Sequence, residues 1–270
     1  GIVIPLAKMC VGRPVKLCFS REDEFRYAYV RQGLHINLKT AVNKDGKIVG
    51  LINTMAWDGG AYTEYGVNIT KAAGWASAGP YDIDNVTTDS YCVYTNHPVG
   101  GPYRGFGMSE MHFGLEQNMD MVAEAIGISP LEIRRINGIR DGGLAATCQT
   151  IEVSGYHECL ERAAELIDYE KPCEKPADPH LVRGKGIASA WKAPSMPTDC
   201  AASVIIRMNE DGTFILTCSC HDMGQGSDTT MAMMAAEILS VDPSKIKVHT
   251  GDTDLTPYDW QTVASRATYC

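Results

Sequence analysis

Two stretches of the sequence combine alternating apolar residues with a glycine-closed turn, and they constrain the fold more than any other feature. The first spans residues 34–56 with its turn at residues 43–46, and the second spans residues 204–218 with its turn at residues 209–212. This pattern is typical of an antiparallel hairpin, because glycine accepts the left-handed backbone that such a turn requires. We therefore expect an α+β fold of two related mixed α/β units, each built on an antiparallel hairpin.

Helical periodicity follows each hairpin. Apolar residues at spacings of three and four predict a core-facing stripe at Met111, Leu115, Met119, Val122 and Ile126. Ser129 and Pro130 have the residue types that begin a helix, and this helix should end near Gly138. Further helices are expected over residues 156–167 and after Gly226. The last should bury one face, formed by Met231, Met234, Ala235 and Ile238.

Glycine-rich sequence at residues 138–155 is the best candidate for a domain boundary. It gives a first domain over residues 1–145 and a second over residues 146–270. The chain begins Gly1-Ile2-Val3 and ends Ala267-Thr268-Tyr269-Cys270, and both ends resemble sequence from the interior of a longer protein. We expect the chain to be an internal fragment.

Composition excludes several functional classes. The formal net charge of −9 argues against nucleic-acid binding, which depends on clustered lysine and arginine. Neither a membrane-spanning apolar run nor a secretory signal is evident, so we expect a cytoplasmic protein. Ten cysteines show no CxxC pair, which favours reduced thiols. The close set Cys218, Cys220 and His221 could bind a soft metal, but it also continues the alternation of a strand, and we predict no metal ligands.

Three loops could carry chemistry. The loop of residues 100–107 holds Arg104 and Phe106 between glycines, so its backbone could approach a ligand closely while the arginine meets an anion. A tight strand-to-helix turn with a solvated arginine explains it equally well. In the loop of residues 221–226, a glutamine amide could bind the edge of a heterocycle, or the loop could only begin a helix. The segment of residues 262–268 could form an anion-binding nest or a plain loop.

Taken together, Gly-Pro-Tyr-Arg-Gly-Phe-Gly, Asp-Met-Gly-Gln-Gly and Ala-Ser-Arg-Ala-Thr occur in the order and approximate separation of a known family. The chain resembles the molybdopterin-binding large subunit of the xanthine dehydrogenase/aldehyde oxidase family over nearly its whole length. The resemblance implies hydroxylation of an aldehyde or an N-heterocycle, with water as the oxygen source and molybdopterin as the cofactor. It further implies partners that carry 2Fe-2S clusters and FAD, together with the rest of the molybdopterin subunit.

The resemblance also implies the site residues. Its cofactor contacts fall on Tyr103, Arg104, Met223, Gln225, Ala264, Ser265, Arg266 and Ala267. Tyr103 and Arg104 match residues beside the metal, and Ala264 matches the residue of the last segment nearest to it. Phe106 matches an aromatic residue that stacks on the substrate, and Ser195 falls near a hydroxyl position of the substrate pocket.

Departures from the family pattern are equally informative. The family's glycine-rich loop and its general-base glutamate would lie outside residues 1–270, so we assign no catalytic residue and expect the chain to be inactive by itself. Ala72 stands where xanthine-type enzymes carry a purine-orienting arginine, which puts a purine substrate in doubt. A non-catalytic cofactor-binding or assembly module of the same fold is the alternative. An unrelated nucleotide binder is disfavoured, because no Walker lysine follows the glycines.

Overall fold

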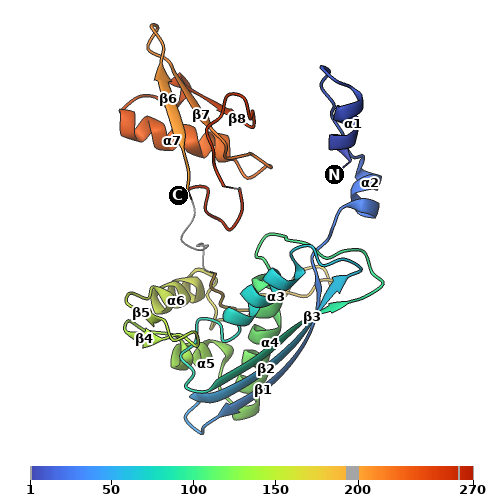
Figure 1. The fold of residues 1–270 in the computed structure, drawn as a ribbon. Coiled ribbons are helices and arrows are strands. Elements are labelled where there is room, and N and C mark those ends of the chain that lie inside the picture. Colours follow the sequence, from blue (N-terminus) through green and yellow to red (C-terminus); the bar gives the residue numbers. More distant parts are fainter. Residues whose placement is uncertain (1, 193–200, 261, 270) are drawn as a thin grey trace. The chain divides into compact units, whose positions relative to one another are not determined.

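The computed structural model describes residues 2–192, 201–260 and 262–269 (Figure 1). The chain divides into two compact units: unit 1 is Gly1–Lys192 and unit 2 is Ala193–Cys270. In the described ranges, no helix has the length and apolar character needed to cross a membrane. The sequence-based domain boundary at residue 145 stays a prediction, since compactness alone does not define domains.

Unit 1 is built on a mixed three-stranded sheet. Its strands are β1 (Gly33–Val42), β2 (Ile48–Gly60) and β3 (Val86–Tyr94), in the order β1-β2-β3. The first pair is antiparallel, as the hairpin pattern predicted, and the second pair is parallel. Helix α3 (Gly66–Trp75) connects the two parallel strands. This parallel pairing is not evident from the sequence, since its partners are separated by a whole helix.

Unit 2 repeats this arrangement. Strands β6 (Val204–Met208) and β7 (Phe214–Cys218) form the predicted hairpin, and β8 (Ile246–Thr250) pairs with β7 in parallel. Helix α7 (Ser227–Leu239) and the short 3-10 helix η1 (Pro243–Lys245) lie between the parallel strands. The two hairpin turns also correspond, because the N–H of Gly46 donates to Asn43 and that of Gly212 to Asn209. The two related halves expected from the sequence are therefore present.

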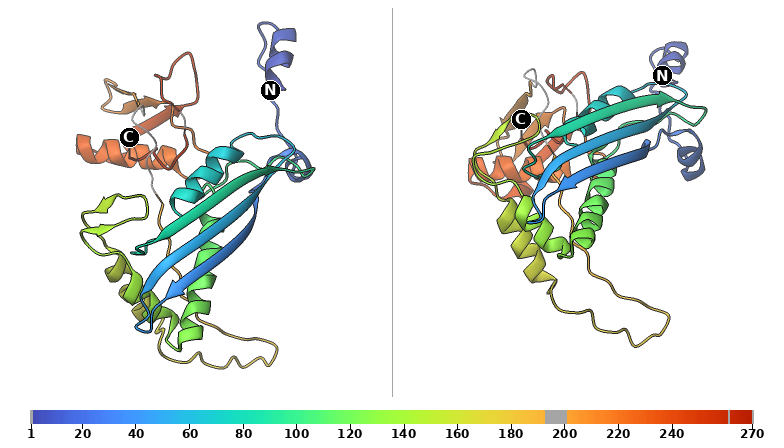
Figure 2. Two further views of the ribbon diagram at one scale, coloured as in Figure 1. Left: turned by 60° about the horizontal axis from the view of Figure 1, so that its bottom comes forward. Right: turned by 90° about the horizontal axis from the view of Figure 1, so that it is seen from below.

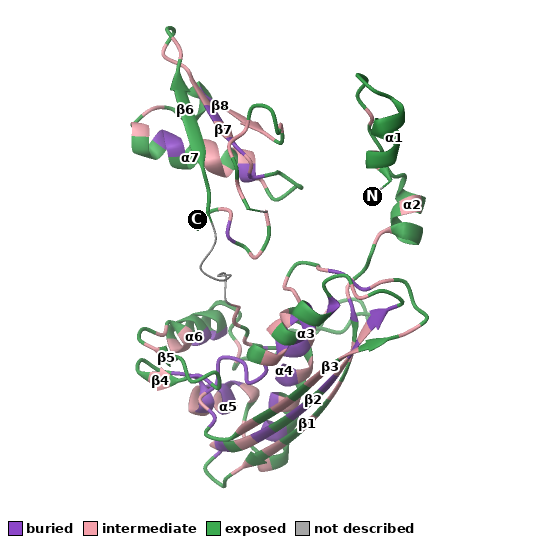
Figure 3. Cartoon of the chain, in the orientation of Figure 1, coloured by how far each residue is buried: buried purple, intermediate pink, exposed green. Residues whose placement is uncertain are grey.

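One face of the first sheet carries the larger core. Alternate residues of β2 are buried (Leu51, Met55 and Trp57), and the intervening ones are more exposed (Figure 3). Helices α3 and α4 (Met108–Ile126) pack on the buried face, as the further views show (Figure 2). The predicted stripe of α4 is confirmed, since its first four members are buried in this core and Ile126 packs against it.

Helix α5 (Pro130–Asn137) is locked to α4 by a buried ionic network. Ser129 accepts from the N–H of Glu132 at 3.0 Å, which confirms the predicted helix start. The fully buried Arg134 donates to Glu116 at 2.8 Å and to Asp120 at 2.7 Å. Glu116 also accepts from the hydroxyl of Tyr81 at 2.6 Å. The network satisfies charges that would otherwise be costly to bury.

The remaining elements of unit 1 are smaller. Helix α6 (Tyr156–Leu166) forms a minor core with α5, close to its predicted bounds. A short hairpin of β4 (Gly143–Leu144) and β5 (Thr150–Ile151) precedes it. Helices α1 (Val3–Met9) and α2 (Arg21–Tyr27) have no buried residues and lie outside the main core.

Helix α7 presents a different face from the predicted one. The face packed in the core of unit 2 consists of Met231, Ala232, Ala235, Ala236 and Leu239. Met234 and Ile238 are instead 43% and 81% exposed, so that part of the prediction is wrong. Apolar residues surround much of this helix, and spacing alone could not identify the side that faces the sheet.

Candidate functional site

The loop of residues 100–107 has the left-handed backbone that its glycines suggested. The φ angles are +102° at Gly105, +54° at Phe106 and +84° at Gly107. An added Cβ at Gly105 would lie 2.0 Å from the Oγ of Ser109, and one at Gly107 would lie 2.8 Å from Ile69. At Gly105 and Gly107 glycine accepts both the φ angle and the close packing, while Phe106 adopts the left-handed backbone between them.

Tyr103 and Arg104 lie at the exposed tip of this loop. The Tyr103 side chain is 61% exposed. Among the described residues, none forms a hydrogen bond or ion pair with the Arg104 guanidinium, so this charge can meet an anion from outside. The Arg104 carbonyl is held from within, because it accepts from Nη2 of Arg31 at 2.6 Å.

Phe106 has a partly buried position at the base of the loop. Its ring packs against the core of unit 1 and meets Tyr65 edge-on, with ring centroids 6.4 Å apart. A ring held in this way has little rotational freedom. Its remaining exposed face could contact a planar ligand, which stays a prediction.

Helix α4 begins directly after this loop and lacks a side-chain cap. Gly107 is its N-cap residue and makes no side-chain hydrogen bond to the first turn. The first N–H groups of a helix carry partial positive charge and attract anions when no cap occupies them. Together with the exposed Arg104 guanidinium, this end of α4 offers hydrogen-bond donors to an anion.

The loop of residues 221–226 is closed by its own side chains. Gln225 accepts from the N–H of Met223 at 2.6 Å and donates to the His221 carbonyl at 2.8 Å. The Asp222 carboxylate accepts from the N–H of Gly224 at 2.6 Å, and such backbone N–H groups hold its pKa below the usual range. The Gln225 amide is thus engaged by its neighbours, and the Met223 side chain is 72% exposed.

The segment of residues 262–268 contains a strained turn. Ala264 and Ser265 both have a φ of +58°, and the N–H of Arg266 donates to the Val263 carbonyl at 3.2 Å. Two successive positive φ angles are those of a type I′ turn, which usually contains glycine, asparagine or aspartate. For alanine and serine the left-handed region costs roughly 1–2 kcal/mol per residue, and such strain clusters at functional sites.

A buried arginine anchors this turn. Arg266 is 2% exposed, pairs with Asp259 at 2.7 Å and donates to the Ala201 carbonyl at 3.1 Å. Ala267 packs against the core of unit 2. Of the four predicted residues here, Arg266 and Ala267 therefore point into the protein, while the backbone of Ala264 and Ser265 forms the turn.

Unit 2 brings the second and third loops together. The N–H of His221 donates to the Thr262 hydroxyl at 2.9 Å, which joins the two loops directly. Cys218 and Cys220 are buried in the core of this unit, as expected of strand residues, and burial raises the pKa of the Cys218 thiol. Ser195 lies outside the described residues.

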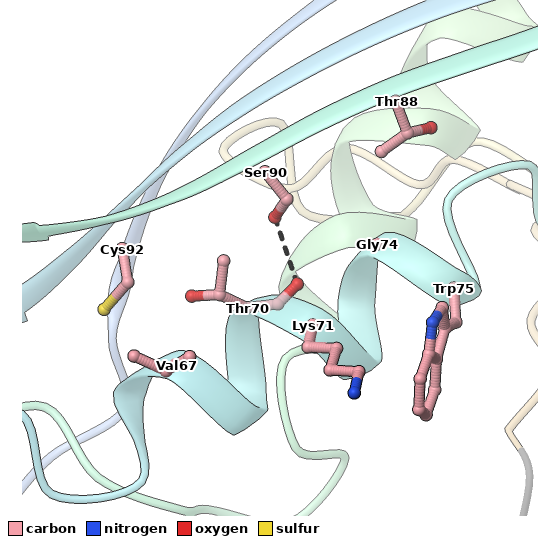
Figure 4. Close-up of a pocket in the computed structure, with 8 residues that line it drawn as sticks. All are labelled: Val67, Thr70, Lys71, Gly74, Trp75, Thr88, Ser90 and Cys92. Carbon is pink, nitrogen blue, oxygen red and sulfur yellow. Dashed lines mark hydrogen bonds between the residues drawn. The ribbon is translucent and has the colours of Figure 1, made fainter.

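A pocket of about 400 Å³ lies between α3 and β3 (Figure 4). Lys71 and Trp75 line it, with the Lys71 ammonium 4.8 Å from the centre of the Trp75 ring. The Ser90 hydroxyl donates to the Thr70 carbonyl at 3.0 Å, the contact drawn in the figure. Ala72, the next residue, lies about 100° further round the helix, so Lys71 and Ala72 do not share a face.

Sequence reasoning missed two side chains that shape these loops. Arg31 donates to the Arg104 carbonyl and so stabilises the first loop. Asp259 pairs with Arg266 and so stabilises the third. Arg31 and Arg104 are separated by 73 positions, so no local pattern connects them. Asp259 is seven positions from Arg266 and could have been noticed as an unpaired acid beside a hydroxyl-rich loop.

Comparison with known proteins identifies the family. The sequence matches two families, each described as a molybdopterin cofactor-binding domain, at residues 1–138 and 162–270. It is 34% identical to the xanthine dehydrogenase molybdenum-binding subunit of Escherichia coli O157:H7, over 96% of this chain and 35% of that protein. It is 31% identical to the aldehyde oxidoreductase of Megalodesulfovibrio gigas, over 98% of this chain and 30% of that protein.

Solved structures show the same fold. The crystal structure of the aldehyde oxidoreductase from Desulfovibrio desulfuricans superposes with a TM-score of 0.83 at 28% identity, over 98% of this chain and 30% of that one. The chain thus spans about a third of the length of the relatives it matches. The family matches cover most of the chain and include all three loops. The chain belongs to the family of molybdopterin cofactor-binding domains.

Proposed function

We propose that this chain forms part of a molybdenum-dependent hydroxylase that oxidises an aldehyde or an N-heterocycle with water as the oxygen source. The relatives named above are a xanthine dehydrogenase subunit and an aldehyde oxidoreductase, which supports these two substrate classes. When bound, the molybdenum cofactor would supply the redox and oxygen-transfer chemistry. The residues of this chain would bind and orient the cofactor and the substrate.

The observation that carries the proposal is the state of the Arg104 loop. Its backbone is fixed by left-handed residues and its carbonyl is held by Arg31, while the Arg104 guanidinium has no partner in the described part of the chain. A guanidinium on such a loop, next to the free N–H groups of an uncapped helix, can bind an anionic ligand. We assign Tyr103 and Arg104 to the cofactor and Phe106 to the substrate.

Unit 2 would contribute through backbone and apolar contacts. We assign the Met223 side chain and the 264–267 turn to the cofactor, with Arg266 holding that turn in shape from the inside. The exposed Gln225 amide already bonds to Met223, His221 and Ser227, so a ligand would compete with these hydrogen bonds. Ser195 remains our candidate for a substrate contact.

The rest of the enzyme is part of the same proposal. We infer that electrons leave through 2Fe-2S and FAD groups on partner subunits or domains, and that the remaining part of the molybdopterin subunit completes the site. We also place the protein in the cytoplasm, and the unpaired thiols of the described cysteines support a reducing environment.

The test is the molybdenum and pterin content of the chain after coproduction with the remaining part of the molybdopterin subunit, in a host that makes molybdopterin. Elemental analysis and the fluorescence of the oxidised pterin measure the two components separately. We expect pterin to copurify, and Arg104→Met to lower its amount, with Arg13→Met, an exposed arginine outside the three loops, as the matched control. A folded chain with no pterin, or equal pterin in all three proteins, would favour an assembly module instead.

A further inference from the structure

Arg31, which the sequence did not single out, contacts the Arg104 loop at Arg104 and at Tyr103. We propose that Arg31 is a positioning residue, whose guanidinium fixes the loop so that the Arg104 side chain faces an anionic ligand. This inference rests on the proposed function, because it takes the loop to be a cofactor contact.

Three contacts converge on the Arg31 guanidinium. Its Nη2 donates to the Arg104 carbonyl at 2.6 Å, and the group lies 4.6 Å from the centre of the Tyr103 ring. Its Nη1 forms an ion pair with Glu110 at 3.0 Å. One planar cation therefore links the tip of the loop to the first turn of α4, where Glu110 lies.

The backbone places Arg31 at the base of the loop. The N–H of Gly101 donates to the Val30 carbonyl at 2.9 Å, and Val30 and Gly100 form a parallel bridge. An added Cβ at Gly101 would lie 2.4 Å from the Tyr29 ring, so only glycine permits this approach. The segment before β1 is thus held against the loop at the two residues that precede Arg31.

A guanidinium is suited to this task and an ammonium is not. Its planar fork can donate to a carbonyl, face a carboxylate and stack on a ring at the same time, whereas lysine offers a compact point charge. The Arg31 and Glu110 side chains are 33% and 13% exposed, so water weakens their contact only in part. The Arg31 guanidinium is thus engaged by groups of the protein itself, and the Glu110 carboxylate neutralises its charge.

Hydrogen exchange tests the positioning role without requiring activity. In Arg31→Met, loss of a hydrogen bond from a charged donor should make the amides of residues 103–109 exchange about tenfold faster. Arg31→Lys should recover part of this protection through Glu110. Arg26→Met, which breaks an exposed ion pair in α2, is the control and should leave the loop unchanged.

The location of the change distinguishes positioning from general stability. We expect the faster exchange to be greatest in the loop, with a fall in the unfolding midpoint of unit 1 no larger than the loss of these contacts explains. Unaltered loop exchange in Arg31→Met, or acceleration spread evenly over β1 to β3, would overturn the proposal.

Pterin content separates this inference from the proposed function. Arg31→Met and Arg104→Met should both lower the pterin that copurifies, but only Arg31→Met should loosen the loop. If the loop loosens while pterin content is unchanged in both variants, the cofactor role of the loop is wrong and the hold of Arg31 on the loop still stands.

Discussion

The buried Arg134 network gives the sharpest stability prediction. Arg134→Met removes a fully buried cation and leaves the Glu116 carboxylate, 7% exposed, without a counter-ion. Breaking a buried pair in this way costs roughly 3–5 kcal/mol. Asp120, the second carboxylate, is 49% exposed and adds little, since water solvates it once the pair is lost. We expect the free energy of unfolding of unit 1 to fall by about 4 kcal/mol.

A double variant isolates the contribution of the unpaired charge. Arg134→Met with Glu116→Gln removes both charges. Tyr81 and the N–H of Ser189 now donate to different oxygens of Glu116, at 2.6 Å and 2.7 Å; the amide oxygen can still accept from Ser189, and the amide NH2 can donate to the Tyr81 hydroxyl. In both variants the carbonyls of Glu116 and Pro130 lose a hydrogen bond from Arg134, and each loss lowers the free energy of unfolding by about 1 kcal/mol. The double variant should therefore be more stable than Arg134→Met alone.

Urea unfolding followed by tryptophan fluorescence measures these differences, because three of the four tryptophans lie in unit 1. Arg135→Met is the matched control on the same helix, with a side chain 32% exposed, and should cost less than about 1 kcal/mol. The reasoning fails if Arg134→Met costs less than about 1 kcal/mol, or if the double variant is the less stable of the two.

Three further predictions concern unit 1. Asn137→Ala should lower its free energy of unfolding by about 2–4 kcal/mol in urea titrations, because it leaves the buried N–H of Ile48 without its acceptor at 2.8 Å. Gly60→Ala should lower the midpoint of thermal unfolding much more than Gly142→Ala does. Both positions have positive φ, but only at Gly60 would the new Cβ meet backbone, at 2.3 Å. Burial lowers the pKa of His112, so the unfolded chain binds its proton more readily, and stability should fall as pH drops below about 6.5. His112→Gln should flatten this dependence in urea titrations between about pH 7 and 5, and an unchanged slope would exclude His112 as its source.

Local patterns predicted the elements whose determinants are local. Both hairpins, the buried stripe of α4 and the start of α5 follow from alternation, helical spacing and a capping serine, and all are confirmed. Each depends on residues within a few positions of one another. The resemblance to the molybdopterin-binding family, confirmed by the family matches, likewise rested on three short motifs.

Features set by distant contacts were not predictable. Strand β8 was not anticipated, because its parallel partner β7 precedes it by an entire helix. The exposed position of Ile238 depends on which side of α7 meets the sheet, and spacing does not encode that choice. Arg31 could not be connected to Arg104, since the contact exists only once β1, β2 and β3 bring the two segments together.

The two separate cores have an evolutionary consequence. Among the described residues, the core of unit 1 shares no residue with the core of unit 2, and each core is packed against the sheet of its own unit. A core substitution in one unit is therefore compensated by neighbours in that same unit, and distant independent sites combine additively. Substitutions can then accumulate independently in the loop that carries Arg104 and in the turn at Ala264.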